Sequence, residues 1–240
     1  IEFIGIRVRE EDPVMSGKYD RLAKDLMKVS LTAYSWTAIL GGILLFTFIT
    51  LFPGFFKYMA GIFRPVMHVY ALMFLAESGV LYVYYYGWDK MNDDIFLKWV
   101  HCSLSVLLNL IGTVLMYLAN SWATFMQAPG GIDSEGRFLG NIWHVIHSTL
   151  WNPVGVHRIL GNIVFGGGIV GAYAAYHYLT AKNEEERAHY DWVCYVAMFI
   201  CIFGLIPLPF AGYWLMKEVY AFRQQMGITL MGGIMAWLFI

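Results

Sequence analysis

Charged residues are scarce in this chain, and positive charge is not in excess. Each of these two properties excludes a class of protein. Charged residues make up 14% of the 240 residues, hydrophobic residues make up 59%, and the mean hydropathy is +0.56. A typical soluble domain carries about 25% charged residues. The composition therefore excludes an ordinary soluble domain. The net charge of −1 provides no basic footprint for nucleic acid, so no nucleic-acid partner is expected.

Cysteine is also scarce. Cys102, Cys194 and Cys201 lie in apolar stretches, without metal-ligand spacing and without the Cys-x-x-Cys-His motif of covalent haem attachment. We expect three buried thiols. Nothing resembles a signal peptide. Because the chain begins at Ile1 without a methionine and is still apolar at Ile240, we expect a fragment or an incompletely observed polypeptide.

Apolar stretches long enough to cross a bilayer recur along the chain. A spanning helix needs about 20 mostly apolar residues. The sequence predicts helices over residues 29–52, 66–86, 96–118, 155–180 and 190–216, and the start of a sixth near residue 225. The predicted fold class is an all-α polytopic membrane helical bundle. Pro207 and Pro209 should interrupt the fifth helix. Gly166, Gly167, Gly168 and Gly171 suit close approach of another helix or of a flat ligand.

The basic residues suggest an orientation. Residues 1–28 are predicted to be a cytoplasmic amphipathic lead-in, and residues 29–240 the membrane bundle, with a non-cytoplasmic loop at 119–154. In this topology the two sides hold ten and six basic residues: Arg7, Arg9, Lys18, Arg21, Lys24, Lys28, Lys90, Lys98, Lys182 and Arg187 against Lys57, Arg64, Arg137, Arg158, Lys217 and Arg223. Cytoplasmic loops carry the excess of Lys and Arg, so the N-terminal side is predicted to be cytoplasmic.

One carboxylate lies inside a predicted span. Glu77 is near the middle of the run from Val66 to Tyr86. Such a group is costly in a bilayer and is normally kept where it faces a partner, a cavity or a proton path. We expect Glu77 to transfer protons or to balance charge near a cofactor. The alternative is a structural carboxyl that is hydrogen-bonded across helices.

The seven histidines are the candidate cofactor ligands, because a b-type haem is held by imidazole nitrogen without a covalent motif. His68, His144, His147 and His157 are expected at or near the non-cytoplasmic face and are the candidate ligands of a haem iron. His101, His177 and His189 are expected toward the cytoplasmic face, with His189 solvated in a polar segment. For each histidine the alternative is an interfacial side chain that is merely hydrogen-bonded.

Several short motifs resemble those of the cytochrome bd quinol oxidase subunit I family. The stretch Phe74-Leu75-Ala76-Glu77-Ser78 is followed by Gly87-Trp88-Asp89-Lys90, as on one helix of that family. Agreement continues at Ser16-Gly17-Lys18 with Lys24 to Lys28, at Ala119-Asn120-Ser121-Trp122 with Met126 to Gly130, and at Asn152-Pro153-Val154 with the span that follows. The resemblance runs in order from about residue 14 to about residue 205.

The resemblance implies a quinol-oxidising complex in the prokaryotic inner membrane. Glu77 matches a family carboxylate implicated in proton delivery to the haem site. Three family features have no counterpart: the first helix with its haem-ligating histidine, a second acidic residue where this chain has Val69, and a haem ligand where it has Gly161. His157 lies one helical turn before Gly161.

These observations predict a function with alternatives. The leading hypothesis is an integral membrane subunit of a respiratory electron-transfer complex that exchanges electrons with the quinone pool and can carry haem b. Its partners would be other membrane and redox subunits, quinone and lipid. The first alternative is a cofactor-free anchor that docks partner redox proteins through residues 123–153. The second is a proton-translocating subunit, based on Glu77 and the break at Pro207 and Pro209.

Overall fold

The structure is a computed structural model that describes residues 1–92 and 94–232, and the side chains only up to residue 229. The described residues form helices: α1 (Glu2–Val8), α2 (Pro13–Leu51), α3 (Pro53–Met91), α4 (Ile95–Gln127), α5 (Ile142–Ile146), α6 (Trp151–Thr180), α7 (Glu184–Leu205), α8 (Leu208–Phe222) and α9 (Gln224–Gly232). No strand occurs among them beyond an isolated bridge between Ile132 and Phe138. The predicted all-α fold class is confirmed.

Five helical segments are long and apolar enough to cross a membrane. They are α2, α3, α4, α6 and the stretch Glu184–Phe222 that combines α7 and α8. At most 11% of the most apolar window of each is buried, so most apolar side chains face outward, as they do toward lipid. The predicted five spans are confirmed. Helix α9 lies where a sixth span was predicted to begin, and residues 233–240 lie outside the described residues.

Prolines set two of the helix boundaries. Pro53 lacks a backbone N–H, ends α2 and stands at the first position of α3, where proline is favoured. Only Phe52 separates these two helices of 39 residues each. Pro207 and Pro209 likewise separate α7 from α8, so the predicted interruption of the fifth span is present.

All five spans are longer than the sequence predicted. Asp12 caps α2, accepting a hydrogen bond from Met15 N at 2.9 Å, and the helix continues unbroken from Pro13 to Leu51. The predicted boundary at residue 28 is therefore not a helix boundary. Helix α4 continues to Gln127 and α6 starts at Trp151, so the connection covers residues 128–150 and contains α5. The predicted cytoplasmic placement of residues 1–28 stays a prediction.

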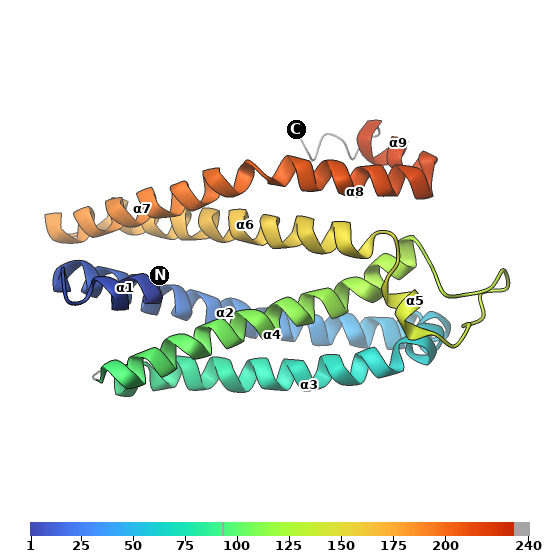
Figure 1. Cartoon of the computed structure of the whole chain (residues 1–240), viewed down its shortest axis with the longest axis horizontal. Helices are drawn as coiled ribbons and strands as arrows, with labels where there is room; N and C mark the ends of the chain where they lie inside the picture. Colours follow the sequence, from blue (N-terminus) through green and yellow to red (C-terminus); the bar gives the residue numbers. More distant parts are fainter. Residues whose placement is uncertain (93, 233–240) are drawn as a thin grey trace. The chain divides into compact units, whose positions relative to one another are not determined.

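The chain divides into two compact units, Ile1–Leu115 and Met116–Ile240. In the first unit, α2 and α3 run antiparallel, and α1 packs on the first turns of α2 (Figure 1). Ser16 Oγ of α2 donates a hydrogen bond to the Gly5 carbonyl of α1 at 2.8 Å. Ala23, Tyr84 and Trp88 form a buried apolar cluster, with Met27 and Leu104 packed against it.

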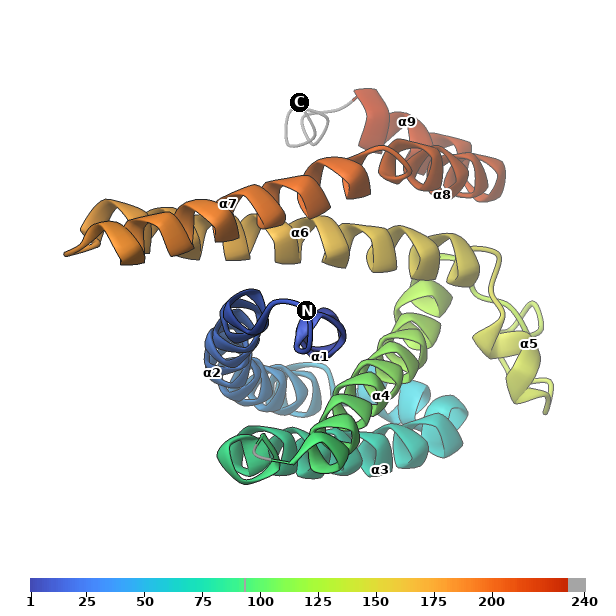
Figure 2. The same cartoon turned by 60° about the vertical axis from the view of Figure 1, so that its left-hand side comes forward.

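In the second unit, α6 and α7 form a long antiparallel pair (Figure 2), while α8 packs on α6 and α9 packs on α8. Glycines bring α6 and α7 close together. A Cβ atom on Gly167 would stand 3.1 Å from the Ala197 carbonyl oxygen, and one on Gly204 would stand 2.8 Å from Val164 Cγ2. The glycine-rich stretch of α6 therefore serves helix packing, one of its two predicted uses.

Candidate functional site

The Glu77 carboxylate lies between α3 and α4. The residue is half-buried, and a Cβ atom on Gly112 of α4 would be 3.0 Å from Glu77 Oε1. Because Gly112 has no side chain, the Glu77 carboxylate can occupy the space beside it. Among the described residues, no protein group donates a hydrogen bond to it. The cross-helix hydrogen bond expected of a purely structural carboxyl is absent from that part of the chain.

The neighbouring residue, Ser78, connects α3 to α2. The Tyr34 hydroxyl and Ser78 Oγ are 2.6 Å apart, and Ser78 Oγ donates to the Phe74 carbonyl at 2.9 Å. The Tyr34 ring stacks on Phe74 with ring centroids 5.7 Å apart. Because the serine proton goes to Phe74, the tyrosine is the donor to Ser78. Glu77 therefore stands on a segment of α3 that is fixed to α2 by both a hydrogen bond and a ring contact.

A second polar cluster joins α1, α3 and α4. Tyr84 is seven residues after Glu77, so it lies on the same face of α3, about 10 Å further along. Its hydroxyl donates to Glu2 Oε2 at 2.7 Å, and Glu2 Oε1 is 2.6 Å from His101 Nδ1. His101 Nε2 is 2.8 Å from the Tyr84 carbonyl oxygen. All three side chains are buried, with exposed fractions of 3–6%.

Ring contacts and an ion pair surround this cluster. The imidazole of His101 stacks on Tyr84 with centroids 4.1 Å apart and meets Trp88 edge-on at 4.8 Å. Lys98, itself buried, forms an ion pair with Asp20 of α2. Sequence reasoning placed His101 only by depth and missed this cluster. The available signal was the one that identified Glu77, namely a polar side chain in an apolar helix.

Two of the four predicted haem ligands lie on long helices, one in each unit. His68 is exposed on α3 of the first unit. His157 is half-buried on α6 of the second, where a Cβ atom on Gly212 of α8 would be 3.7 Å from its Nε2. A glycine thus faces this imidazole. No side chain occupies the space beside Gly161 within 4 Å of its Cβ position.

The other two predicted ligands lie on and beside α5. His144 and His147 are both exposed. The ring of His147 contacts Trp143 and Trp151, with centroids 5.8 and 4.5 Å apart. His147 Nδ1 is 2.9 Å from the Trp143 carbonyl oxygen, so Nδ1 carries the proton. Nε2 is then the nitrogen with a lone pair, which is the arrangement that a metal ligand requires.

One histidine differs from expectation. His189 was expected to be solvated, but it is buried, with 4% exposure, and its ring contacts Tyr190 and Trp192. The prediction was wrong because it considered only the preceding glutamates. These belong to the first turn of α7, which Asn183 caps through Glu186 N. His189 lies one turn further on, beside Tyr190 and Trp192 of the same helix.

The four candidate haem ligands are divided between the two units, with His68 in the first and the other three in the second. Among His144, His147 and His157 of the second unit, no ring contact or hydrogen bond joins any two in the described part of the chain. Nor is there a group of three His, Cys, Asp or Glu side chains there that could hold a metal ion. His157 and His147 each offer one nitrogen.

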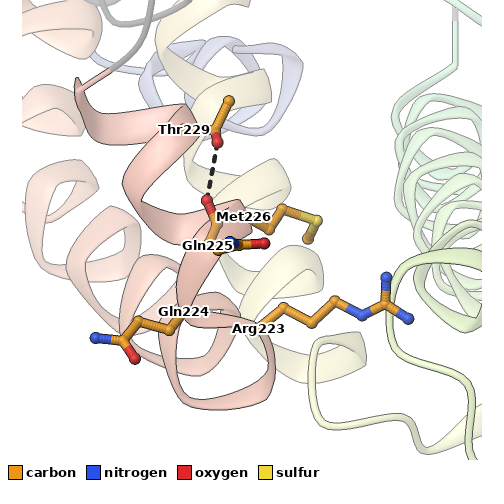
Figure 3. A pocket seen from close by; sticks show the side chains of 5 residues that line it. All are labelled: Arg223, Gln224, Gln225, Met226 and Thr229. Atoms are coloured by element: carbon orange, nitrogen blue, oxygen red, sulfur yellow. Dashed lines mark hydrogen bonds between the residues drawn. The ribbon is translucent and has the colours of Figure 1, made fainter.

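A shallow pocket opens at the junction of α8 and α9. Its volume is about 510 Å³, and it is lined by Arg223, Gln224, Gln225, Met226 and Thr229. Arg223 and Gln224 extend in opposite directions, and Thr229 Oγ1 donates to the Gln225 carbonyl at 2.8 Å (Figure 3). None of the predicted site residues lines it.

Comparison with known proteins decides the family. The family model of cytochrome bd terminal oxidase subunit I matches residues 6–236. The chain belongs to this family. The comparisons with curated proteins and with solved structures returned no match. As a bd-type subunit I, the protein is a multi-pass membrane subunit from a family of electron-transport oxidases, normally found in the prokaryotic inner membrane. The family associates with other oxidase subunits, binds haems and uses quinol.

Proposed function

We propose that this bd-type subunit serves a quinol-linked respiratory complex and that Glu77 transfers protons or balances charge during its turnover. The carboxylate itself carries the proposal. It is half-buried against α4, and no protein group in the described residues donates a hydrogen bond to hold it ionised. A carboxyl in such surroundings is suited to taking up and releasing a proton.

We further propose that the chain exchanges electrons with the membrane quinone pool together with other membrane and redox subunits. Family membership supports this role. The N-terminal segment, residues 1–28, is proposed to lie on the cytoplasmic side, because that side would hold ten of the sixteen basic residues.

We propose that haem b is held through histidine. The candidates are His68, His144, His147 and His157. Geometry favours His147, whose Nε2 carries the lone pair, and His157, which faces a glycine.

A cofactor-free anchor is the second candidate function. Gly161 at the aligned ligand position favours it. The connection between α4 and α6 would be its docking surface. Leu139 and Trp143 lie there with 65% and 64% of their surfaces exposed, and exposed apolar side chains of this size suit a protein partner.

A pyridine haemochrome assay on the purified complex separates the two candidates. The electron-carrying role predicts haem b that is lost from this chain in His157→Ala or His147→Ala. Full haem occupancy of the partner subunits with none in this chain would leave the anchor. Glu77→Gln tests the proton role separately. It should slow quinol-driven, proton-coupled turnover, and unchanged turnover with unchanged charge movement would reject a role for Glu77.

A further inference from the structure

The Glu2, Tyr84 and His101 cluster contains a proton whose position the heavy atoms do not fix. The Tyr84 carbonyl oxygen can only accept, so His101 Nε2, 2.8 Å away, must carry a proton. His101 Nδ1 then faces Glu2 Oε1 at 2.6 Å. Either the imidazolium donates to a carboxylate, or a carboxylic acid donates to the neutral imidazole. In both states, one proton lies between these two atoms.

The remaining contact suits both states equally. The Tyr84 hydroxyl donates to Glu2 Oε2 at 2.7 Å, and this oxygen accepts whether or not the other oxygen carries a proton. The shared proton can therefore move between Glu2 and His101 without rearranging the partners. Because all three side chains are buried, the hydrogen bonds are shielded from water and are correspondingly strong.

We propose that Glu2 of α1 and His101 of α4 form a second proton-binding site in the unit that contains Glu77. At rest, the pair holds the shared proton and is electrically neutral. It takes up one further proton on the Glu2 carboxylate, which gives a carboxylic acid beside an imidazolium with a charge of plus one. It then releases one proton and returns to the neutral state. Its use in turnover rests on the proposed function, whereas proton binding itself does not.

Other titratable groups surround the pair, and most are already engaged. Lys98 of α4 and Asp20 of α2 form their own ion pair, and Tyr84 of α3 donates to Glu2. The Cys102 thiol of α4 and the amino group of Ile1 also interact electrostatically with this region. Because Glu2 and His101 interact so closely, their protonation steps belong to the pair rather than to either residue.

A purely structural role is the rival explanation. Glu2 also holds α1 against α3 and α4, just as Ser16 holds α1 against α2 through the Gly5 carbonyl at 2.8 Å. A latch of this kind would need the hydrogen bonds but no titratable proton. The two explanations therefore differ for a substitution that keeps the bonds and removes the proton.

Glu2→Gln is that substitution. The glutamine carbonyl accepts from Tyr84, and its amide N–H donates to His101 Nδ1, so the contacts of α1 are kept. Ser16→Ala is the matched control, since it loosens α1 without touching the pair. Tyr84→Phe is the second variant. It removes one donor to Glu2 and keeps the shared proton, so it should move the midpoint of the titration without abolishing it.

Two measurements on the purified complex test the proposal. Infrared difference spectra between the acidic and alkaline ends of the pH profile should contain a carboxyl band and an imidazole band that disappear together in Glu2→Gln. Quinol-driven turnover of Glu2→Gln should fall several-fold below that of wild type on the acidic side of the pH profile, where the wild-type pair takes up its further proton. Ser16→Ala should leave the bands and the shape of the profile unchanged.

The outcomes keep this inference apart from the proposed function. Persistent bands and an unchanged pH profile in Glu2→Gln would overturn the proton-binding site. Loss of the bands and an altered profile in Ser16→Ala would overturn it as well. If Glu77→Gln leaves turnover unchanged while Glu2→Gln removes the bands, the proposed function fails and the proton-binding site stands. The reverse pattern rejects the site and leaves the role of Glu77 intact.

Discussion

Glu77 and Gly112 share one space between α3 and α4. A Cβ atom at residue 112 would stand 3.0 Å from Glu77 Oε1, closer than ordinary van der Waals contact. The glycine therefore determines where the carboxylate can lie. Four predictions follow from this relationship and from other contacts of the two units.

Gly112→Ala should displace the Glu77 carboxylate and lower proton-coupled turnover. Misplacing a catalytic group by about 1 Å can cost up to about 100-fold in rate, and we expect at least about a tenfold loss. Gly79→Ala is the control. Gly79 has no atom within 4 Å of its Cβ position, and alanine in a helix stabilises by about 0.5–1 kcal/mol relative to glycine. Equal turnover in the two variants would contradict the positioning role of Gly112.

Gly167→Ala should destabilise the second unit. Its new methyl group would stand 3.1 Å from the Ala197 carbonyl oxygen, and backbone cannot move aside as a flexible side chain can. Overpacking of this kind costs about 1–3 kcal/mol, measured as a loss of unfolding free energy in detergent. Gly166→Ala and Gly168→Ala have open space at their Cβ positions and should not lose stability. A similar loss in all three would point to helix flexibility rather than packing.

Lys98→Met should destabilise the first unit far more than Lys24→Met. Lys98 is buried and pairs with Asp20, so its removal leaves a largely buried carboxylate unpaired, which costs about 3–5 kcal/mol. Lys24 pairs with Asp89 at 2.5 Å, but 84% of the Asp89 side chain is exposed, and such pairs contribute about 0–1 kcal/mol. Denaturant unfolding of both variants measures the difference, and equal losses would refute the distinction.

Tyr34→Phe should weaken the attachment of α2 to α3 near Glu77. It removes the hydroxyl that donates to Ser78 at 2.6 Å and keeps the stacking on Phe74. A double-mutant cycle with Ser78→Ala should give a coupling of about 0.5–1.5 kcal/mol, the usual net contribution of one hydrogen bond. A coupling near zero would mean that the contact contributes nothing to stability.

The spans were predictable from the sequence because apolar composition is local. The ends of the helices were harder to predict. The polar residues Lys18 and Asp25 lie within α2, where they mark a change of surroundings rather than the end of a helix. Helical hydrogen bonds continue into water, so the bilayer boundary and the helix boundary are separate properties. The same holds for α4, which continues past Trp122 to Gln127.

The polar sites divide in the same way. Glu77 was identifiable because a carboxylate inside an apolar run is energetically costly, and both the carboxylate and the run can be read from the same segment of sequence. Gly112, which makes room for it, gives no local signal. The pairing of Glu2 with His101 joins residues 99 positions apart, and only tertiary packing brings them together. Whether any of the four predicted histidines binds haem stays a prediction.

The turn between α2 and α3 constrains how the protein enters a membrane. Each helix has 39 residues, a length of about 58 Å at 1.5 Å per residue, whereas the hydrocarbon core is about 30 Å thick. A turn of one residue cannot leave one helix in the bilayer while the other waits outside. We therefore expect the two helices to insert together as a single hairpin. Any mutation that disrupts one of them should therefore prevent insertion of both.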